Sequence, residues 1–82
     1  MTRTEINTRV QKVCAEELGI ELSRIVPEAH IEEDFGADSL DMVELCMALE
    51  EEFQIELEDE KVEKVKTIQQ LIELVSSKLQ TV

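Results

Sequence analysis

Residues 34–53 read DFGADSLDMVELCMALEEEF, a run that predicts a turn followed by a helix. Gly36 permits the positive φ of a tight turn. Asp38 can then cap a helix whose third residue is Asp41, and both carboxylates lie near the positive end of the helix dipole. The helix is predicted to continue to the end of the run, with the hydroxyl of Ser39 exposed at its first position.

A first helix is predicted upstream, over residues 3–18. Thr2 and Glu5 have the spacing of a capping box, and Gly19 can take the left-handed conformation that ends a helix. Its apolar face consists of Ile6, Val10, Val13, Cys14 and Leu18. Residues 20–38 then lose this periodicity and contain Pro27, so they are predicted to form a long loop without regular structure.

The length and composition indicate one all-α domain spanning residues 1–82. Hydrophobic residues make up 43% of the chain, and only two are aromatic, so the core is expected to be aliphatic. Residues 59–64 can form one or two helical turns, and Thr67 with Gln70 repeats the capping-box spacing before a last helix. We therefore predict a small four-helix bundle with a long loop between helices 1 and 2 and a short third helix.

The charge is concentrated in the middle of the chain. Residues 25–60 contain 14 Asp and Glu and no Lys or Arg, whereas the rest of the chain contains 6 acids and 8 bases, for a net charge of −12. Such a segment repels nucleic acids and anionic membranes, so we expect neither nucleic-acid binding nor stable membrane association. The expected partners present basic surfaces, and the chain is expected to be a monomer.

The two cysteines predict a reducing compartment. Cys14 and Cys46 lie 32 positions apart, without CxxC or metal-ligand spacing, and buried reduced thiols are the simplest interpretation. No apolar run is long enough for a membrane span, and the N-terminus lacks the apolar stretch of a secretory signal. We expect a soluble, cytoplasmic protein.

The helix that starts near Ser39 is predicted to have two apolar faces. Spacing of about 100° per residue places Met42, Cys46, Leu49 and Phe53 on the core face. The same spacing places Leu40, Val43 and Met47 off that face, beside Glu44 and Glu51. We interpret this second group as a docking strip, in which apolar contacts give affinity and carboxylates orient a basic partner. The alternative is that its apolar members pack beneath the long loop.

Ser39 lacks the sequence context of a hydrolase nucleophile or of a calcium loop. A serine hydrolase needs a base, but the single histidine, His30, lies nine residues upstream and no GxSxG motif is present. A calcium loop starting at Asp34 fails because its third position is glycine and its sixth is serine. We predict no catalytic residue and no metal site, although loose binding of a divalent ion by Asp34, Asp38 and Asp41 stays open. Ser39 could also be a simple helix cap.

The run DFGADSLD, continuing into MVELCMALEEEF, resembles the acyl carrier protein family over essentially the whole chain. The resemblance implies that Ser39 receives a 4′-phosphopantetheine arm from coenzyme A, attached by a separate phosphopantetheinyl transferase (holo-carrier synthase). Acyl chains then travel as thioesters on the arm, and the protein is a carrier, not an enzyme. Asp38 and Asp41 flank the modified serine.

The same resemblance implies a surface for partners and a space for the acyl chain. The residues that match the family's partner surface are Leu40, Val43, Glu44, Met47, Glu50 and Glu51. Those expected to line the acyl space are Leu45, Cys46, Leu49, Phe53, Ile68, Leu71 and Ile72. Departures from the family pattern are Met42, Cys46 and the absence of proline at Leu57-Glu58.

The expected role is delivery of growing acyl chains to the enzymes of a dissociated fatty acid synthase. Polyketide, aminoacyl or D-alanyl, and mitochondrial pathways use the same carrier chemistry, and the sequence does not separate them. An unmodified acidic interaction module, with Ser39 as a mere cap, is the alternative of a different class.

Overall fold

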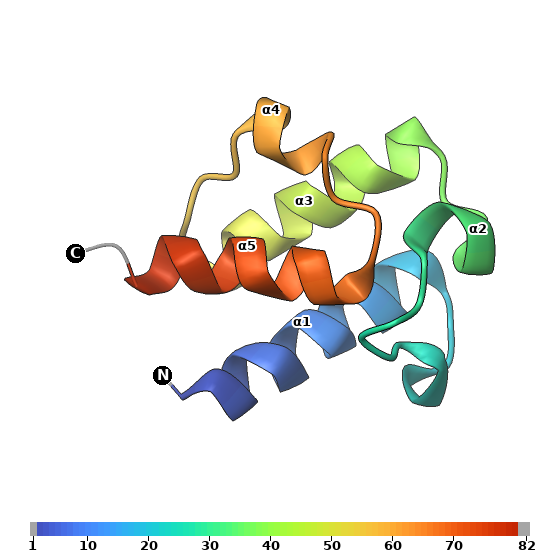
Figure 1. The fold of residues 1–82 in the computed structure, drawn as a ribbon, viewed down its shortest axis with the longest axis horizontal. Helices are drawn as coiled ribbons and strands as arrows, with labels where there is room; N and C mark the ends of the chain where they lie inside the picture. The colour runs from blue at the N-terminus through green and yellow to red at the C-terminus, as the bar shows by residue number, and fades with distance from the viewer. Residues whose placement is uncertain (1, 81–82) are drawn as a thin grey trace.

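The structure is a computed structural model that describes residues 2–80. Its elements, in chain order, are α1 (Arg3–Leu18), the 3-10 turn η1 (Leu22–Arg24), α2 (Ile31–Phe35), α3 (Ser39–Phe53), α4 (Asp59–Val62) and α5 (Ile68–Gln80) (Figure 1). Within these residues the only β-type pairing is an isolated bridge between His30 and Thr67. The predicted all-helical fold is confirmed.

Capping residues set the ends of α1, as the sequence predicted. The Glu5 amide donates to Thr2 Oγ1 at 3.2 Å, and the Glu5 carboxylate accepts from the Thr2 backbone amide. At the other end Gly19 adopts φ 66°, and its amide donates to the Ala15 carbonyl. The predicted bounds of residues 3–18 are confirmed.

The connection between α1 and α3 is more ordered than the sequence predicted. It contains η1 and the five-residue α2, so the prediction of a loop without regular structure is wrong. The N-cap of α2 is His30, whose Nδ1 accepts from the Glu33 amide at 3.3 Å, while the His30 amide donates to the Asp34 carboxylate at 2.6 Å. A helix of one turn shows no periodicity, and histidine is not among the preferred caps, so neither signal was visible in the sequence.

Backbone hydrogen bonds attach this connection to the segment that precedes α5. The Ile31 amide donates to the Lys66 carbonyl at 2.9 Å, and the Ile68 amide donates to the Ala29 carbonyl at 3.1 Å. Figure 1 shows the result: α2 lies at the end of the bundle where α3 and α5 begin. These bonds place the start of α3, and with it Ser39, against residues from the far end of the chain.

The short helix α4 spans four residues, within the predicted range of 59–64, and none of them is buried. Its N-cap residue, Glu58, makes no capping hydrogen bond through its side chain. Instead the Glu58 carboxylate accepts from Lys78 Nζ on α5 at 2.7 Å, and Lys61 Nζ lies 3.8 Å away. The Lys78 hydrogen bond is the main reason that the pKa of Glu58 lies below its usual range, with the charges of Lys61 and Lys78 acting in the same direction.

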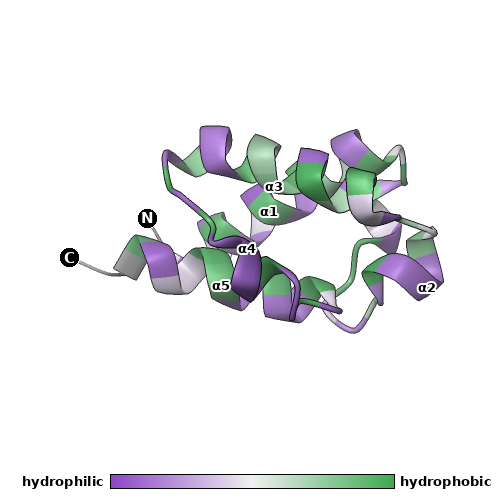
Figure 2. Cartoon of the chain, turned by 90° about the horizontal axis from the view of Figure 1, so that it is seen from above, coloured by the Kyte–Doolittle hydropathy of each residue, from purple (hydrophilic) through white to green (hydrophobic). Residues whose placement is uncertain are grey.

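The core is formed by α1, α3 and α5, joined by residues of the long connection. In Figure 2 hydrophobic and hydrophilic residues alternate along each long helix, as expected for helices with one buried face. The most deeply buried side chains are Val10, Cys14, Ile25, Ile31, Leu45, Leu49, Ile68, Leu71, Ile72, Val75 and Ser76. Nearly all are aliphatic, which confirms the prediction from the composition.

Two leucines on the same helix allow a direct test of this core. Leu45 is 0% exposed and Leu40 is 64% exposed. We expect Leu45→Ala to lower the free energy of unfolding by about 2–5 kcal/mol, because it removes buried surface and leaves a cavity. Leu40→Ala should change it by less than about 0.5 kcal/mol. Urea unfolding followed by far-UV circular dichroism measures both, and equal losses would contradict the burial assigned to α3.

Candidate functional site

The first turn of α3 is held by reciprocal hydrogen bonds between two aspartates. The Asp41 amide donates to Asp38 Oδ1 at 2.9 Å, and the Asp38 amide donates to Asp41 Oδ2 at 3.0 Å. Asp38 is therefore the N-cap, and Ser39 is the first helical residue. Before this turn Gly36 adopts φ 67°, the left-handed conformation predicted for it.

Because Asp38 caps the helix, Ser39 does not. Its side chain is exposed, and its hydroxyl has no hydrogen-bond partner among residues 2–80. The alternative in which Ser39 is a simple cap is therefore wrong. An exposed, unbonded hydroxyl on a rigid helical turn is accessible to an external reagent.

A groove of about 380 Å³ opens beside Ser39, between the start of α3 and α4. Its apolar lining comes from Met42, Val43, Val62 and Val65, and its charged lining from Glu32, Asp59, Glu63 and Lys66. The α4 side of this groove was not predicted. Its residues come from a short segment joined to α5 by the Glu58–Lys78 hydrogen bond, and sequence periodicity carries no signal for such a contact.

The docking strip lies on the exposed face of α3, as predicted. Leu40, Val43 and Met47 are 64%, 54% and 59% exposed, and Glu44 and Glu51 are exposed beside them. The alternative that these apolar side chains pack beneath the long loop is wrong. The strip places an apolar row and two carboxylates on a straight helix that begins at Ser39.

Glu50 differs from the other acids at this surface. Its side chain is only partly exposed, and Glu50 Oε2 accepts from the Leu57 amide at 2.8 Å. This bond holds the chain as it leaves α3 toward α4. The carboxylate has a structural role in addition to any contact with partners.

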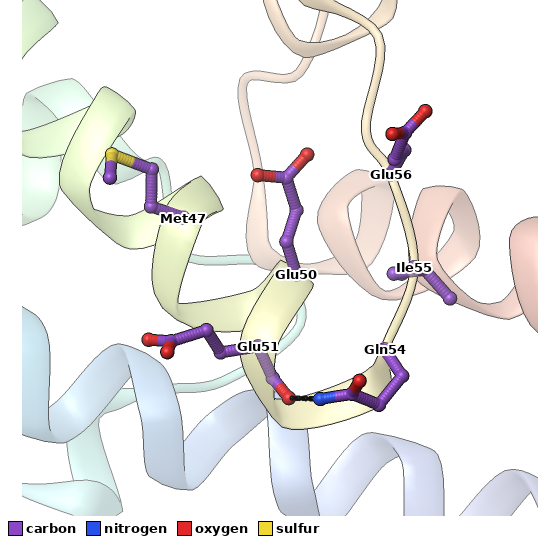
Figure 3. A pocket seen from close by; sticks show the side chains of 6 residues that line it. All are labelled: Met47, Glu50, Glu51, Gln54, Ile55 and Glu56. Carbon is purple, nitrogen blue, oxygen red and sulfur yellow. Dashed lines mark hydrogen bonds between the residues drawn. The ribbon is translucent and has the colours of Figure 1, made fainter.

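A second hollow, of about 560 Å³, lies at the far end of the docking strip. Figure 3 shows the residues that line it: Met47, Glu50, Glu51, Gln54, Ile55 and Glu56. Gln54 ends α3 in the left-handed conformation with φ 55°, and its side-chain amide donates to the Glu51 carbonyl at 2.8 Å. The sequence did not predict this hollow, since it depends on the turn at Gln54, where no glycine marks the helix end.

Neither the histidine nor the cysteines supply a base or an exposed nucleophile to Ser39. The His30 ring caps α2 through Nδ1. Burial raises the pKa of Cys46 to about 11, with smaller contributions from the charges of Glu50 and Asp59. Burial raises the pKa of Cys14 to about 12, and the nearby Cys46 adds to the effect.

Two further findings concern the described part of the chain. Residues 2–80 contain no group of three or more His, Cys, Asp or Glu side chains placed to hold a metal ion. No helix in that part has the length and hydrophobicity needed to span a membrane.

Comparison with known proteins accounts for this arrangement. Residues 8–75 match a family model described as a phosphopantetheine attachment site. The chain is 46% identical over 79 residues to an acyl carrier protein of Thermosynechococcus vestitus, covering 96% of this chain and 98% of the relative. The chain belongs to the acyl carrier protein family. A solved acyl carrier protein structure from Enterococcus faecalis, 32% identical, superposes with a TM-score of 0.78 over 95% of this chain and 99% of that one.

Members of this family are carriers, not enzymes, and the structure agrees with attachment of a phosphopantetheine arm. Attachment to a serine requires a hydroxyl that a second protein can reach, and Ser39 meets that requirement. An arm of this kind is long and partly apolar, and the groove beside Ser39 offers it an apolar surface. The residues present therefore fit the group.

The buried thiols lead to a prediction about chemical labelling of the carrier. At pH 8, a rise in the pKa of Cys46 from 9.0 to about 11 lowers its thiolate fraction about a hundredfold. Because the thiolate is the reactive form, both cysteines of the native chain without its arm should react with iodoacetamide at least about a hundredfold more slowly than in the urea-unfolded chain. The rate should rise about tenfold per pH unit up to pH 10.

Mass spectrometry of samples quenched over time measures these rates. The single variants Cys14→Ser and Cys46→Ser show which thiol reacts. Equally fast labelling of native and unfolded chains would contradict the burial of the two thiols.

Proposed function

We propose that Ser39 is the attachment residue for the phosphopantetheine arm and that this carrier delivers acyl chains to enzymes of fatty acid biosynthesis in the cytoplasm. The observation that carries the proposal is the free hydroxyl of Ser39 at the start of α3, beside an apolar groove. The family match supports it, because the model describes a phosphopantetheine attachment site.

The chain supplies a positioned hydroxyl and leaves its activation to the transferase. The capping bonds of Asp38 and Asp41 hold the first turn of α3, so the backbone that carries the Ser39 hydroxyl is fixed. His30 is engaged in capping α2, so the base that removes the serine proton comes from the transferase. When bound, the arm supplies a thiol that holds acyl chains as thioesters.

The docking strip gives this carrier a way to meet several enzymes. Carboxylates on the same helix as the apolar row steer a basic surface toward Ser39 and raise the rate of encounter. The apolar side chains add contact area, and the flexible Met47 can pack against partners of different shape. We propose that basic patches on fatty acid synthase enzymes and on the holo-carrier synthase bind here.

The apolar groove favours an acyl cargo. Met42, Val62 and Val65 provide a surface on which an alkyl chain loses contact with water. The residues expected to line a deeper space, namely Leu45, Cys46, Leu49, Phe53, Ile68, Leu71 and Ile72, are all buried in the core of this structure. We propose that a chain that enters further does so by parting these side chains.

Modification of Ser39 tests the proposal directly. Incubation of the purified chain with coenzyme A and a broad-specificity phosphopantetheinyl transferase should add one phosphopantetheine, as measured by intact mass. Ser39→Ala should add none, because no acceptor hydroxyl remains at the start of α3. Ser23→Ala is the matched control, since Ser23 is also exposed but lies in η1, and it should accept the arm as the wild type does.

Either an adduct on Ser39→Ala or no adduct on the wild type would overturn the assignment. The cargo is tested separately by recovering the loaded protein from its source cell. Fatty acyl thioesters are expected, whereas exclusively aminoacyl or polyketide intermediates would place the carrier in another pathway.

Charge reversal on the docking strip tests its role with partners. Glu44→Lys should lower kcat/KM of the transferase for the carrier by roughly three- to tenfold at low salt, because the field that steers the basic enzyme is weakened. Glu17→Lys makes the same charge change at an exposed position on a different helix, α1, and should have a much smaller effect. Circular dichroism verifies that both variants keep their helices. Equal effects of the two variants would show that only net charge matters.

A further inference from the structure

Lys66 is the one basic residue that lines the groove beside Ser39. The other charged residues there are Glu32, Asp59 and Glu63, which are all acidic. Lys66 is exposed, and its ammonium forms no ion pair with any residue between 2 and 80. In contrast, Lys61 and Lys78 both pair with Glu58.

The backbone of Lys66 is fixed on both sides, although its side chain is unpaired. Its amide donates to Gln70 Oε1 at 2.6 Å, and its carbonyl accepts from the Ile31 amide at 2.9 Å. These bonds join Lys66 to the first turn of α5 and to the start of α2. The side chain therefore extends from a fixed point at the mouth of the groove.

Attachment of the arm to Ser39 would place a new negative charge in an acidic setting. The arm is linked through a phosphodiester, so its phosphorus is bonded directly to Ser39 Oγ. Asp38 and Asp41 lie in the same helical turn, and the acidic residues of the groove lie opposite. Lys66 is the only cation of the groove lining that can offset this charge.

We propose that the Lys66 ammonium binds the phosphodiester of the arm on Ser39 and holds the start of the arm at the mouth of the groove. This inference rests on the proposed function, since it needs the arm on Ser39. The contact directs the arm over the apolar lining between α3 and α4 instead of leaving it to extend freely into solvent. An acyl chain on the arm is thereby presented to the groove.

The size of the effect follows from the exposure of the pair. Ion pairs at protein surfaces contribute little free energy. Loss of the Lys66 contact should therefore change the ratio of docked to free arm by only about two- to fivefold. The pair is also screened by salt, because the Debye length falls from about 10 Å at 0.1 M to about 3 Å at 1 M. Such a contact guides the arm without preventing an enzyme from withdrawing it.

The test uses 31P NMR of the holo-protein, in which the phosphodiester is the only phosphorus. Wild type, Lys66→Gln, Lys66→Arg and Lys64→Gln are each loaded with the arm, and intact mass verifies the loading. Lys64→Gln is the matched control because Lys64 is exposed, makes no ion pair among residues 2–80 and does not line the groove. The chemical shift and transverse relaxation of the phosphorus are followed as NaCl is raised from low concentration to about 1 M.

In the wild type, salt should move the 31P shift toward the value of Lys66→Gln and slow the relaxation, as docked arm is released. Lys66→Gln should respond little to salt, with a two- to fivefold lower ratio of docked to free arm. Lys66→Arg and Lys64→Gln should behave as the wild type does. If all four loaded proteins gave the same shift and relaxation, the Lys66 contact would be refuted while the attachment to Ser39 stood. If no variant accepted the arm, the proposed function itself would fail.

Discussion

The reciprocal hydrogen bonds between Asp38 and Asp41 are the interaction on which the rest of this site depends. A helix start leaves backbone amides without partners, and serine is one of the residues that most often satisfies them. Here the two aspartates satisfy amides of the first turn with their own carboxylates. Ser39 therefore does not cap the helix, and its hydroxyl is exposed. The proposed attachment residue is accessible because its neighbours supply the capping bonds.

Two faces of α3 meet different surroundings. One face packs Leu45, Leu49 and Phe53 into the core and so fixes the orientation of α3. A second face exposes the apolar row of the docking strip with acids beside it, the combination that we propose attracts basic proteins. Because the docking strip and Ser39 share one rigid helix, a protein that binds the strip finds the serine at a constant distance. Recognition and attachment are coupled by the geometry of α3 and do not require a change in fold.

Sequence patterns predicted the features that depend on local interactions. The capping boxes at Thr2, Asp38 and Thr67 involve residues three positions apart, so the starts of α1, α3 and α5 could be predicted from the spacing. The exposure of the docking strip followed from helical periodicity in the same way. The docking role of the strip was inferred from helical spacing and charge, and the role of Ser39 from family resemblance, and both stay predictions.

Features that depend on contacts between distant segments were not predicted. The cap of α2 by His30 belongs to a five-residue helix that is too short to be stable alone and whose Ile31 is bonded to Lys66 across the fold. The second side of the groove, with Val62, Val65 and Lys66, likewise comes from residues about 20 or more positions away from Ser39 in the sequence. Glu58 lies in a run of acidic residues and no sequence pattern distinguishes it from them. Its carboxylate nevertheless accepts a hydrogen bond from Lys78 and so joins the start of α4 to α5. No spacing rule relates residues 58 and 78, and the pairing needs the folded chain.

The two sides of the groove beside Ser39 differ in stability. The α3 side belongs to a fifteen-residue helix with four buried residues. The α4 side belongs to a four-residue helix with no buried residue and no side-chain cap, which contributes little stability of its own. The Glu58–Lys78 pair and the Glu50–Leu57 hydrogen bond anchor the chain before α4, and the hydrogen bond between the Ile31 amide and the Lys66 carbonyl anchors it after α4. Under the proposed function, a cargo that changes in length needs one stable side that holds the serine and a second side that moves at low energetic cost, and α3 and α4 suit these two roles.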